Sequence, residues 1–437
     1  MSIPLDNLYH FVQSQLTEPA TLYLFYPHGG RKLTDLNILR HYSVEQTLQQ
    51  PAVICHDQEP LMYDLHQDNQ PEFRQALEKL TEDHRKMVGP DDWLFLKDLN
   101  LQLGTYIPGV SIYDSCVLLH SEKNSTQVEK YQKAGFECAY FWSHAFIARD
   151  WFRFAQFDVR NRPTGVFDQM FLIYSRGWTN SREYRLKFLE MLFKHELADS
   201  SKISIAKQEE GIAVQDYQFK NPNFEMENRS FLENIPECLV SSAASADYDC
   251  QDISGSIMSI VLETMFDDTR IHLTEKTLRP IACGHPFILA AGPGSLEYLR
   301  SYGFKTFDGF IDESYDLETD PVKRLEKICD AMKKIQSMTL PELETWYYAI
   351  REIVIYNRQH FFSPHFWHTI TQELSTNVNA AVNNVLKTRG KKWRENRRQI
   401  RQLKPNHWNI QLRHEDEYVR ARELYRLRFA GKDIKSL

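Results

Sequence analysis

Short apolar runs alternate with polar turns and helical patterns along most of the chain. Each run is rich in β-branched or aromatic side chains and stops at a polar residue, Gly or Pro. We expect strands at Thr21–Tyr26, Ala52–Cys55, Ser115–His120, Cys138–Trp142, Met170–Tyr174, Lys202–Ala206, Ser256–Glu263 and Pro286–Ala291. Strands that alternate with helices are typical of parallel sheets, so the pattern predicts an α/β protein.

Apolar residues spaced by three or four positions predict helices between and after these runs. The expected helices are Thr126–Gly135, Ser181–His195, Ser295–Tyr302, Val322–Ile335 and Leu343–His360. We expect Asn180 or Ser181 to be the N-cap of the second of them.

The strand–helix alternation restarts after a turn-like stretch near residues 155–165. We therefore predict two Rossmann-like domains that face each other across a cleft, followed by a helical basic C-terminal extension. The predicted boundaries are 1–160 for the first domain, 161–345 for the second domain and 346–437 for the extension. In such sheets ligands bind outside the carboxyl ends of the strands, where the polar turns lie.

Length and composition limit the class of protein. A chain of 437 residues, 42% apolar, is long enough for two buried cores. The first residues lack a basic start and an apolar core, and no run of about 18 apolar residues occurs, so we expect no signal peptide and no membrane span. Seven scattered cysteines without a CxxC motif predict reduced thiols in the cytoplasm and no zinc site.

Charge is distributed unevenly. Residues 386–437 hold 16 Lys and Arg against 6 Asp and Glu, a net charge of +10, whereas the rest of the chain has a net charge of −17. The basic tail either binds a polyanion or packs on the acidic body. Within it, Trp393 lies among positive charges that could neutralise phosphates. The candidate nucleic-acid-binding residues are Lys391, Lys392, Trp393, Arg394, Arg397 and Arg398.

The second predicted domain contains a candidate phosphate site. Arg176 follows a strand, and Thr274-Glu275-Lys276 begins a helix. A helix start offers free N–H groups, and an Arg and a Lys add charge for a pyrophosphate, with Glu275 accepting from a ribose hydroxyl. Gly294 and Ser295, in a glycine turn between a strand and a helix, fit close backbone approach and a cap. Each feature is also common in purely structural settings.

The first predicted domain offers candidates for binding and deprotonating a hydroxyl group that would accept a transferred group. His56, Asp57 and Glu59 follow a strand directly, and Asp57, with Glu59 as reserve, is our candidate general base. Three further residues are candidates for acceptor contact: His28 and Gly29 in a glycine-rich turn, and His144 after a later strand. A hydrophilic loop and a structural histidine are the competing interpretations.

Three motifs of other enzyme classes do not occur. The chain has neither the GxGxxG pattern of dinucleotide enzymes nor a GxxxxGK[ST] phosphate loop, and it lacks HExxH spacing. Without a clustered His or Cys ligand set, we expect an enzyme that needs no metal and no bound cofactor.

A set of motifs resembles a family of phage and giant-virus proteins regarded as glycosyltransferases. The resemblance covers most of residues 50–360 and rests on His56–Pro60, Ser175–Trp178, Arg182–Phe188, Leu273–Lys276, Pro280, Gly284, His285–Ile288, Gly294, Leu299, Gly303–Phe307 and Ile311–Asp316. More distantly, the Thr-Glu-Lys triplet is similar to that of fucosyltransferases and exostosin-type enzymes of the GT-B fold.

The resemblance implies a transferase that uses a nucleotide-diphosphate sugar such as a UDP-sugar. Residues 1–160 would then form the acceptor domain and residues 161–345 the nucleotide-sugar domain. Carried over, Lys276 and Arg176 hold the diphosphate and Glu275 lies near the ribose. The leading implied acceptor is a hydroxymethylated pyrimidine in phage DNA, such as hydroxymethylcytosine, with arabinose or glucose as the sugar and double-stranded DNA as a partner. The alternatives are transfer to a polysaccharide or glycan, and a non-catalytic binding protein that retained the fold.

Overall fold

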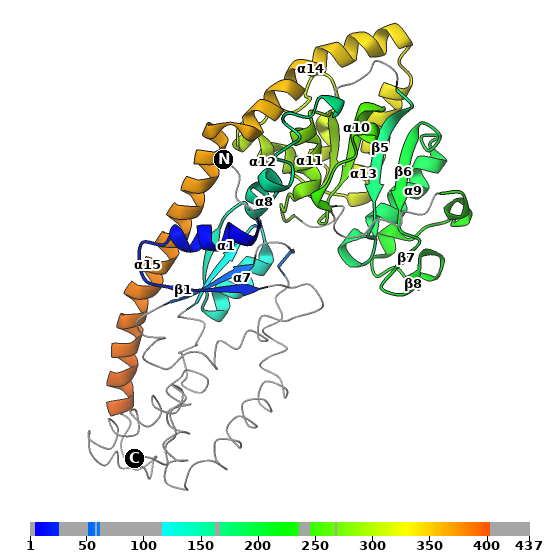
Figure 1. Cartoon of the computed structure of the whole chain (residues 1–437). Coiled ribbons are helices and arrows are strands. Elements are labelled where there is room, and N and C mark those ends of the chain that lie inside the picture. The colour runs from blue at the N-terminus through cyan, green and yellow to red at the C-terminus, as the bar shows by residue number, and fades with distance from the viewer. Residues whose placement is uncertain are drawn as a thin grey trace, which may run out of the picture. The chain divides into compact units, whose positions relative to one another are not determined.

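The computed structural model describes residues 5–25, 51–56, 59–61, 116–161, 167–235, 245–266 and 269–402 (Figure 1). Three of the candidate residues, His28, Gly29 and Asp57, lie outside these ranges.

The chain divides into two compact units, and the described residues of each contain a four-stranded sheet. The first-sheet unit comprises Gln15–His120, Gln127–Ala139 and Thr376–Leu437, and the second-sheet unit comprises Met1–Ser14, Ser121–Thr126 and Tyr140–Ser375. Residues 140–160 thus cluster with the second sheet, whereas the sequence-based boundary joined them to the first. The predicted domain boundaries stay a prediction.

The first sheet has its strands in chain order. They are β1 (Thr21–Phe25), β2 (Ala52–His56), β3 (Cys116–His120) and β4 (Glu137–Tyr140). The β1–β2 and β2–β3 pairs are parallel, and the register places His56 beside His120 at the carboxyl ends of their strands. Helix α7 (Thr126–Ala134) belongs to this unit, as does the part of α15 (Pro364–Gln402) from Thr376 onward.

In the second sheet the order in which strands are added reverses. Its strands β5 (Gln169–Ser175), β6 (Ser201–Ile205), β9 (Ser256–Leu262) and β10 (Phe287–Ala290) are parallel and lie in the order β10-β9-β5-β6. The chain moves from β5 to β6 in one direction and then places β9 on the other side of β5. The carboxyl ends of β5 and β9 are therefore the topological switch point, where open α/β sheets bind ligands.

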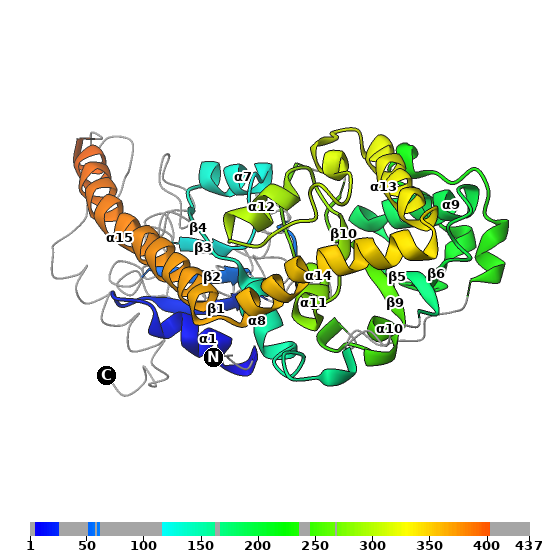
Figure 2. The same ribbon diagram turned by 90° about the horizontal axis from the view of Figure 1, so that it is seen from above.

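Helices cover both faces of the second sheet. Helices α9 and α13 pack against each other, and α11 packs against α8 and α14. Figure 2 shows α9 and α13 on one side of the strands and α10 and α11 on the other. The helix bounds are α1 Leu5–Ser14, α8 Ser143–Trp151, α9 Tyr184–Lys194, α10 Cys250–Ser254, α11 Glu275–Cys283, α12 Ser295–Ser301, α13 Pro321–Gln336 and α14 Leu340–Phe362.

Short elements fill the connections of the second-sheet unit. They are the hairpin strands β7 (Gln208–Glu209) and β8 (Ile212–Ala213), and the 3-10 turns η4 Val159–Asn161, η5 Asn180–Arg182, η6 Val214–Asp216, η7 Pro222–Phe224, η8 Ser230–Asn234 and η10 Glu313–Leu317. The β7–β8 hairpin is antiparallel.

Two parts of the core of the second-sheet unit position the site. Every residue of β9 and β10 is buried, as expected for central strands with both faces covered. Beside the sheet, the Trp142 ring lies 5.1 Å from that of Tyr298 and 4.7 Å from that of Tyr302. This aromatic cluster joins the start of α8 to α12, so both helices are fixed relative to the sheet edge.

The structure confirms an α/β protein with parallel sheets and corrects one helix start. The predicted N-caps Asn180 and Ser181 lie instead within η5, which follows Thr179, and α9 begins at Tyr184. The 3-10 turn intervenes because the chain first folds over the end of β5. Among the described residues, no helix has the length and apolar character that crossing a membrane would require.

Candidate functional site

The segment that leads into the Thr274–Lys276 motif is held from two sides. Lys123 and Ile271 exchange backbone hydrogen bonds of 3.0 Å, forming an isolated antiparallel bridge. The Trp142 indole N–H donates to the Leu273 carbonyl at 2.9 Å. These contacts fix the position of the motif before α11 begins, and the backbone of Thr274 is extended, as an N-cap residue requires.

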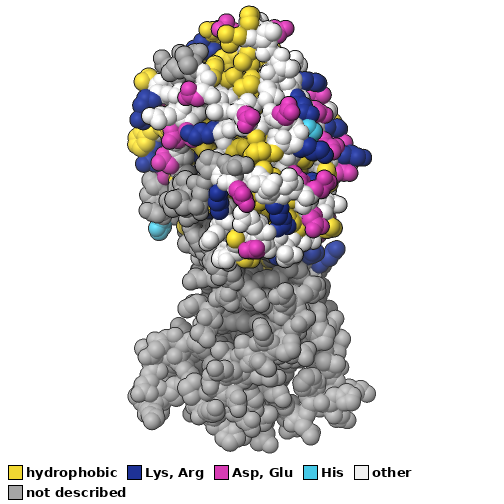
Figure 3. All heavy atoms as spheres, turned by 90° about the vertical axis from the view of Figure 1, so that its right-hand side faces the viewer, with side chains coloured by type: hydrophobic (Ala, Val, Ile, Leu, Met, Phe, Trp, Pro, Cys, Tyr) yellow, Lys and Arg dark blue, Asp and Glu magenta, His cyan; other side chains and the backbone are white. Residues whose placement is uncertain are grey.

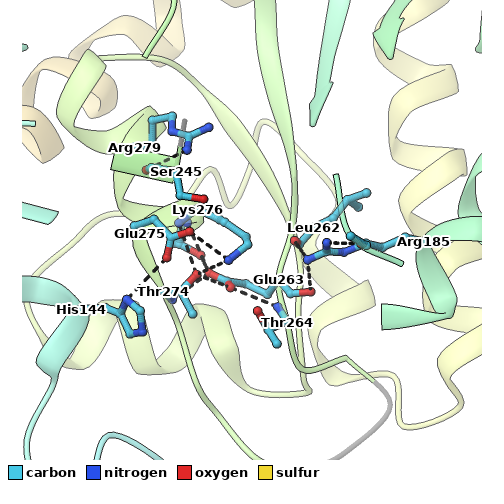
Figure 4. A network of polar contacts seen from close by, with 12 residues as sticks. His144, Arg185, Ser245, Leu262, Glu263, Thr264, Thr274, Glu275, Lys276 and Arg279 are labelled. Atoms are coloured by element: carbon cyan, nitrogen blue, oxygen red, sulfur yellow. Dashed lines mark hydrogen bonds and ion pairs between the residues drawn. The ribbon is translucent and has the colours of Figure 1, made fainter. Parts of the chain in front are cut away.

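A wholly buried carboxylate, Glu263, holds the start of α11 (Figure 4). It follows β9 directly and accepts from the Thr274 backbone N–H at 2.9 Å and the Thr274 hydroxyl at 2.7 Å. It also accepts from the Thr277 hydroxyl at 2.6 Å and the Thr277 N–H at 3.3 Å. Four hydrogen bonds to one carboxylate offset much of the cost of burying it.

The end of β9 is tied to the end of β5 by a buried arginine. Arg185, on α9, donates to the Gly177 carbonyl at 2.5 Å, the Leu262 carbonyl at 2.7 Å and the Glu263 carbonyl at 3.0 Å. The Tyr184 hydroxyl adds a 2.6 Å bond to the Glu263 carbonyl. These side chains belong to the Arg182–Phe188 motif, so at least part of that motif has a structural role.

Glu275 lies between two nitrogen-bearing side chains. Its Oε1 is 3.0 Å from Lys276 Nζ, and its Oε2 is 3.5 Å from His144 Nδ1. Burial raises the pKa of Glu275, but the charges of Lys276 and His144 and the Lys276 hydrogen bond together lower it to about 2. The structure thus brings a residue expected on the acceptor side, His144, into contact with one expected on the donor side.

Arg176 stands in the turn that follows β5. Its side chain is exposed, and it makes no hydrogen bond or ion pair with the described part of the chain. Glu209 holds this turn, because it accepts from the N–H groups of Trp178 at 2.5 Å and Thr179 at 2.7 Å. Next to it, the buried hydroxyl of Ser175 has no hydrogen-bond partner among the described residues. Arg176 is therefore presented at the switch point, close to a buried polar group.

One expectation for the helix start is wrong. The N–H groups of α11 were expected to be free for a pyrophosphate, but the Lys276 N–H donates to the Thr274 hydroxyl at 3.3 Å and the Thr277 N–H to Glu263. The chain supplies its own carboxylate at the position where an external anion would bind. The Lys276 side chain, which is 30% exposed, can still contact a ligand.

The glycine turn after β10 is also satisfied internally. Gly294, with φ of 80°, is the N-cap of α12, so the expected cap, Ser295, is instead the first residue of that helix. The Ser295 hydroxyl donates to the Gly292 carbonyl at 2.6 Å, and Asp316 accepts from the Leu296 N–H at 3.1 Å. Burial raises the pKa of Asp316 to about 6, and the Leu296 hydrogen bond opposes that shift. Ser295 thus serves the turn itself.

The first-sheet candidates are described only in part. His56 is buried at the end of β2, and burial lowers its pKa to about 4, partly opposed by a backbone hydrogen bond. Glu59 is half-buried, three residues beyond β2. The structure does not test whether Asp57 or Glu59 is a base.

The basic tail residues begin in α15. Its backbone is helical through Gln402, which includes the predicted nucleic-acid-binding residues 391–398. The remainder of the tail, 403–437, lies outside the described residues.

Three side chains that matter for the site were not among the predicted residues. They are Glu263, Arg185 and Glu209. For Glu263 the sequence did carry a signal, because it is a carboxylate at the end of the apolar run 256–262, where parallel strands present ligands. The other two contact residues 8 and 31 positions away along the chain, respectively, and no local pattern marks such pairs.

An Asp-x-Asp triplet, the pattern that metal-dependent sugar transferases use, is present at Asp247–Asp249. Asp249 is the N-cap of α10 and accepts from the Gln251 and Asp252 N–H groups, so its role in the structure is a helix cap. Within the described ranges no group of three or more His, Cys, Asp or Glu side chains is placed to hold a metal ion. Metal independence stays a prediction.

Charges of both signs are interspersed on the face of the molecule that Figure 3 shows. That view looks from the side on which Figure 1 draws β6, α9 and the β7–β8 hairpin. Mixed charge is typical of a solvated surface rather than of a polyanion-binding face.

Comparisons with protein-family models and with curated proteins found no match to this chain.

Proposed function

We propose that this protein is a glycosyltransferase that moves a sugar from a nucleotide-diphosphate sugar to an acceptor hydroxyl. One observation carries the proposal: two cationic side chains, Arg176 in the turn after β5 and Lys276 at the start of α11, lie at the carboxyl edge of a single parallel sheet, beside its switch point. Open α/β sheets bind nucleotides at this position.

The chemistry of the leaving group agrees with this arrangement. Transfer from a nucleotide-diphosphate sugar releases a diphosphate, and preorganised cations near that group stabilise the charge that develops on it. Arg176 is exposed and offers a planar fork to phosphate oxygens. Lys276 is partly exposed and held by Glu275 and Thr274, so its ammonium is already oriented.

The network around Glu263 supports the proposal through rigidity. Arg185 binds carbonyls at the ends of both β5 and β9, and Glu263 joins β9 to α11. The turn bearing Arg176 and the helix start bearing Lys276 are therefore connected through buried hydrogen bonds. A site that holds a transition state needs supporting contacts of this kind.

The finer parts of the proposal rest on the sequence. They are a GT-B arrangement in which two Rossmann-like domains close on donor and acceptor, a base at Asp57 or Glu59, and catalysis without metal. DNA with hydroxymethylated pyrimidines remains the leading acceptor because of the resemblance and the basic tail, and a saccharide remains the alternative. Cytoplasmic localisation is likewise a proposal.

Nucleotide-sugar turnover tests the proposal. The purified protein is incubated with a panel of UDP- and GDP-sugars, with hydroxymethylated DNA or oligosaccharide as acceptor, and product is read by mass spectrometry. We expect Lys276→Ala and Arg176→Ala each to lower turnover about 10²–10³-fold, as removal of an oxyanion donor does. The melting temperature should change little, because both side chains are at least partly exposed.

Lys333→Ala is the matched control, since Lys333 is a partly exposed lysine on α13 with a carboxylate neighbour. Turnover equal to wild type in both site variants would remove the two cations from the site. Binding of nucleotide sugars without turnover would instead identify a non-catalytic binding protein. Complete loss of turnover in EDTA, restored by Mn²⁺, would contradict the metal-free mechanism.

A further inference from the structure

Glu209 occupies a position at the carboxyl edge of the second sheet where backbone groups bind an oxyanion. Its Oε2 accepts from two consecutive N–H groups, those of Trp178 at 2.5 Å and Thr179 at 2.7 Å. Its Oε1 lies 3.3 Å from the Arg182 guanidinium. Both N–H groups come from the segment between β5 and the 3-10 turn η5. Two N–H groups that converge on one oxygen, with a guanidinium beside the other, suit phosphate as well as carboxylate.

The surroundings of this position carry more positive than negative charge. Segment 176–183 joins β5 to α9. The described charged side chains that lie in this segment or form hydrogen bonds with it are Arg176, Arg182, Glu183, Arg185, Glu209 and Lys220. Four of these are cations and two are carboxylates, which leaves a net charge of +2 with Glu209 in place. An anion that carries more charge than one carboxylate therefore suits the position better than Glu209 does.

The hairpin that carries Glu209 is attached to the rest of the unit by few contacts. Within the described ranges, β7 and β8 pair with each other and with neither four-stranded sheet. At the tip, Glu210 and Gly211 have positive φ, and a Cβ added at Gly211 would meet no heavy atom within 4 Å. The Glu209 side chain is 18% exposed and that of Arg182 is 27% exposed. The hairpin can therefore move outward without breaking a strand pair of either large sheet.

Other contacts hold the turn that Glu209 binds. The Arg185 guanidinium donates to the Gly177 carbonyl at 2.5 Å, and the Trp178 indole N–H donates to the Ala206 carbonyl at 2.7 Å. Neither contact involves the Glu209 carboxylate. The two N–H groups therefore keep their direction when the carboxylate leaves, and they are preorganised for an incoming anion.

We propose that Glu209 is an internal stand-in for a phosphoryl group, which the diphosphate of the donor displaces from the N–H groups of Trp178 and Thr179. The identity of the ligand rests on the proposed function, which this inference deepens by adding a phosphate position beside Arg176. One phosphate oxygen takes the place of Oε2, and the guanidinium groups of Arg182 and Arg176 pair with the others. Without the donor, the carboxylate returns, so the two N–H groups keep an acceptor. No covalent bond is made or broken in the exchange.

Calorimetric titration of the full-length protein with pyrophosphate tests the exchange. Glu209→Gln keeps an oxygen that accepts from the N–H groups but removes the competing charge, so pyrophosphate should bind about 3–10-fold more tightly than to wild type. Arg182→Gln should bind it about 10-fold or more weakly, because a charged donor is lost. Glu297→Gln is the matched control and should equal wild type, since Glu297 also pairs with an arginine, at 3.4 Å, but on α12. Equal affinity in wild type, Glu209→Gln and Arg182→Gln, or weaker binding in Glu209→Gln, would overturn the proposal.

Hydrogen–deuterium exchange distinguishes displacement of the carboxylate from a purely structural contact. Saturating pyrophosphate should slow amide exchange in residues 176–183 and quicken it in residues 207–213, because the anion protects the turn while the hairpin is released. UDP should act in the same way, and uridine, which lacks the diphosphate, should change neither segment. Unchanged or slower exchange in 207–213 with pyrophosphate bound would contradict the proposal. If pyrophosphate has both effects but UDP does not bind and no nucleotide sugar is turned over, the oxyanion exchange stands and the proposed function fails.

Discussion

Two carboxylates accept backbone N–H groups at the carboxyl edge of the second sheet, and they differ in how they are enclosed. Glu263 is wholly buried and accepts four hydrogen bonds from Thr274 and Thr277. Glu209, on the two-residue strand β7, accepts from Trp178 and Thr179 with its side chain 18% exposed. We call each carboxylate, together with the N–H groups that it accepts, a clasp. The Glu263 clasp is sealed from solvent, and the Glu209 clasp is open to solvent.

The difference indicates two uses of the same interaction. A sealed carboxylate cannot exchange its partners with water, so removing it leaves buried donors unsatisfied. An open carboxylate can be replaced by water or by another anion at small cost. The start of α11 is therefore rigid framework, and the turn bearing Arg176 is the adaptable side of the proposed donor site.

The largest expected effect comes from opening the sealed clasp. Glu263→Ala should lower the free energy of unfolding by about 3–5 kcal/mol, because the N–H groups of Thr264, Thr274 and Thr277 and two hydroxyls lose their acceptor in a buried place. Urea denaturation of wild type and variant measures the change. A loss below about 1 kcal/mol would show that water reaches the cavity and that the clasp is not sealed.

A third carboxylate, Asp316 at the start of α12, sharpens the comparison through pH. Its folded-state pKa of about 6 lies above the usual 3.8, so its contribution to stability is present below pH 3.8 and is lost as pH rises through 6. Asparagine keeps the acceptor for the Leu296 N–H without the charge. We expect Asp316→Asn to be more stable than wild type by about 3 kcal/mol at pH 7 and about equal at pH 4. Equal melting temperatures at both pH values would contradict this.

The smallest effect is expected at the open clasp. Glu209→Ala should lower the free energy of unfolding by about 1 kcal/mol or less, because water can enter the place of this partly exposed carboxylate and accept from the Trp178 and Thr179 N–H groups. The same variant frees two N–H groups and Arg182 beside Arg176. Affinity for pyrophosphate, measured by calorimetry, should stay equal or rise. A fall in affinity would mean that Glu209 orients the site instead of merely closing the turn.

Gly177→Ala provides a second route to the same state. A Cβ at Gly177 would lie 2.7 Å from a Glu209 carboxylate oxygen, so the glutamate has to move away. Its effects should therefore resemble those of Glu209→Ala. Different effects on pyrophosphate affinity would show that the backbone of the turn, and not the carboxylate, controls the site.

Most secondary-structure elements could be predicted from local pattern. The run Met170–Tyr174 became β5 and the pattern Val322–Ile335 became α13, because apolar periodicity reflects which face of an element is buried. The predicted start of α9 was wrong. Asn180 and Ser181 are residue types that often cap helices, but in the structure they lie in a 3-10 turn that precedes the helix.

For the candidate site, too, local pattern accounts for one part and tertiary packing for the other. The sequence by itself determined an α/β chain with parallel strands, and it identified Arg176 and Lys276 as cations following a strand and beginning a helix. Only the tertiary structure decided their surroundings: which of the two sheets has a switch point, that Glu263 occupies the start of α11, and that Glu275 faces His144. Local periodicity reports on neighbours within a few residues, whereas His144 and Glu275 are 131 positions apart and meet only because α8 and α11 pack together.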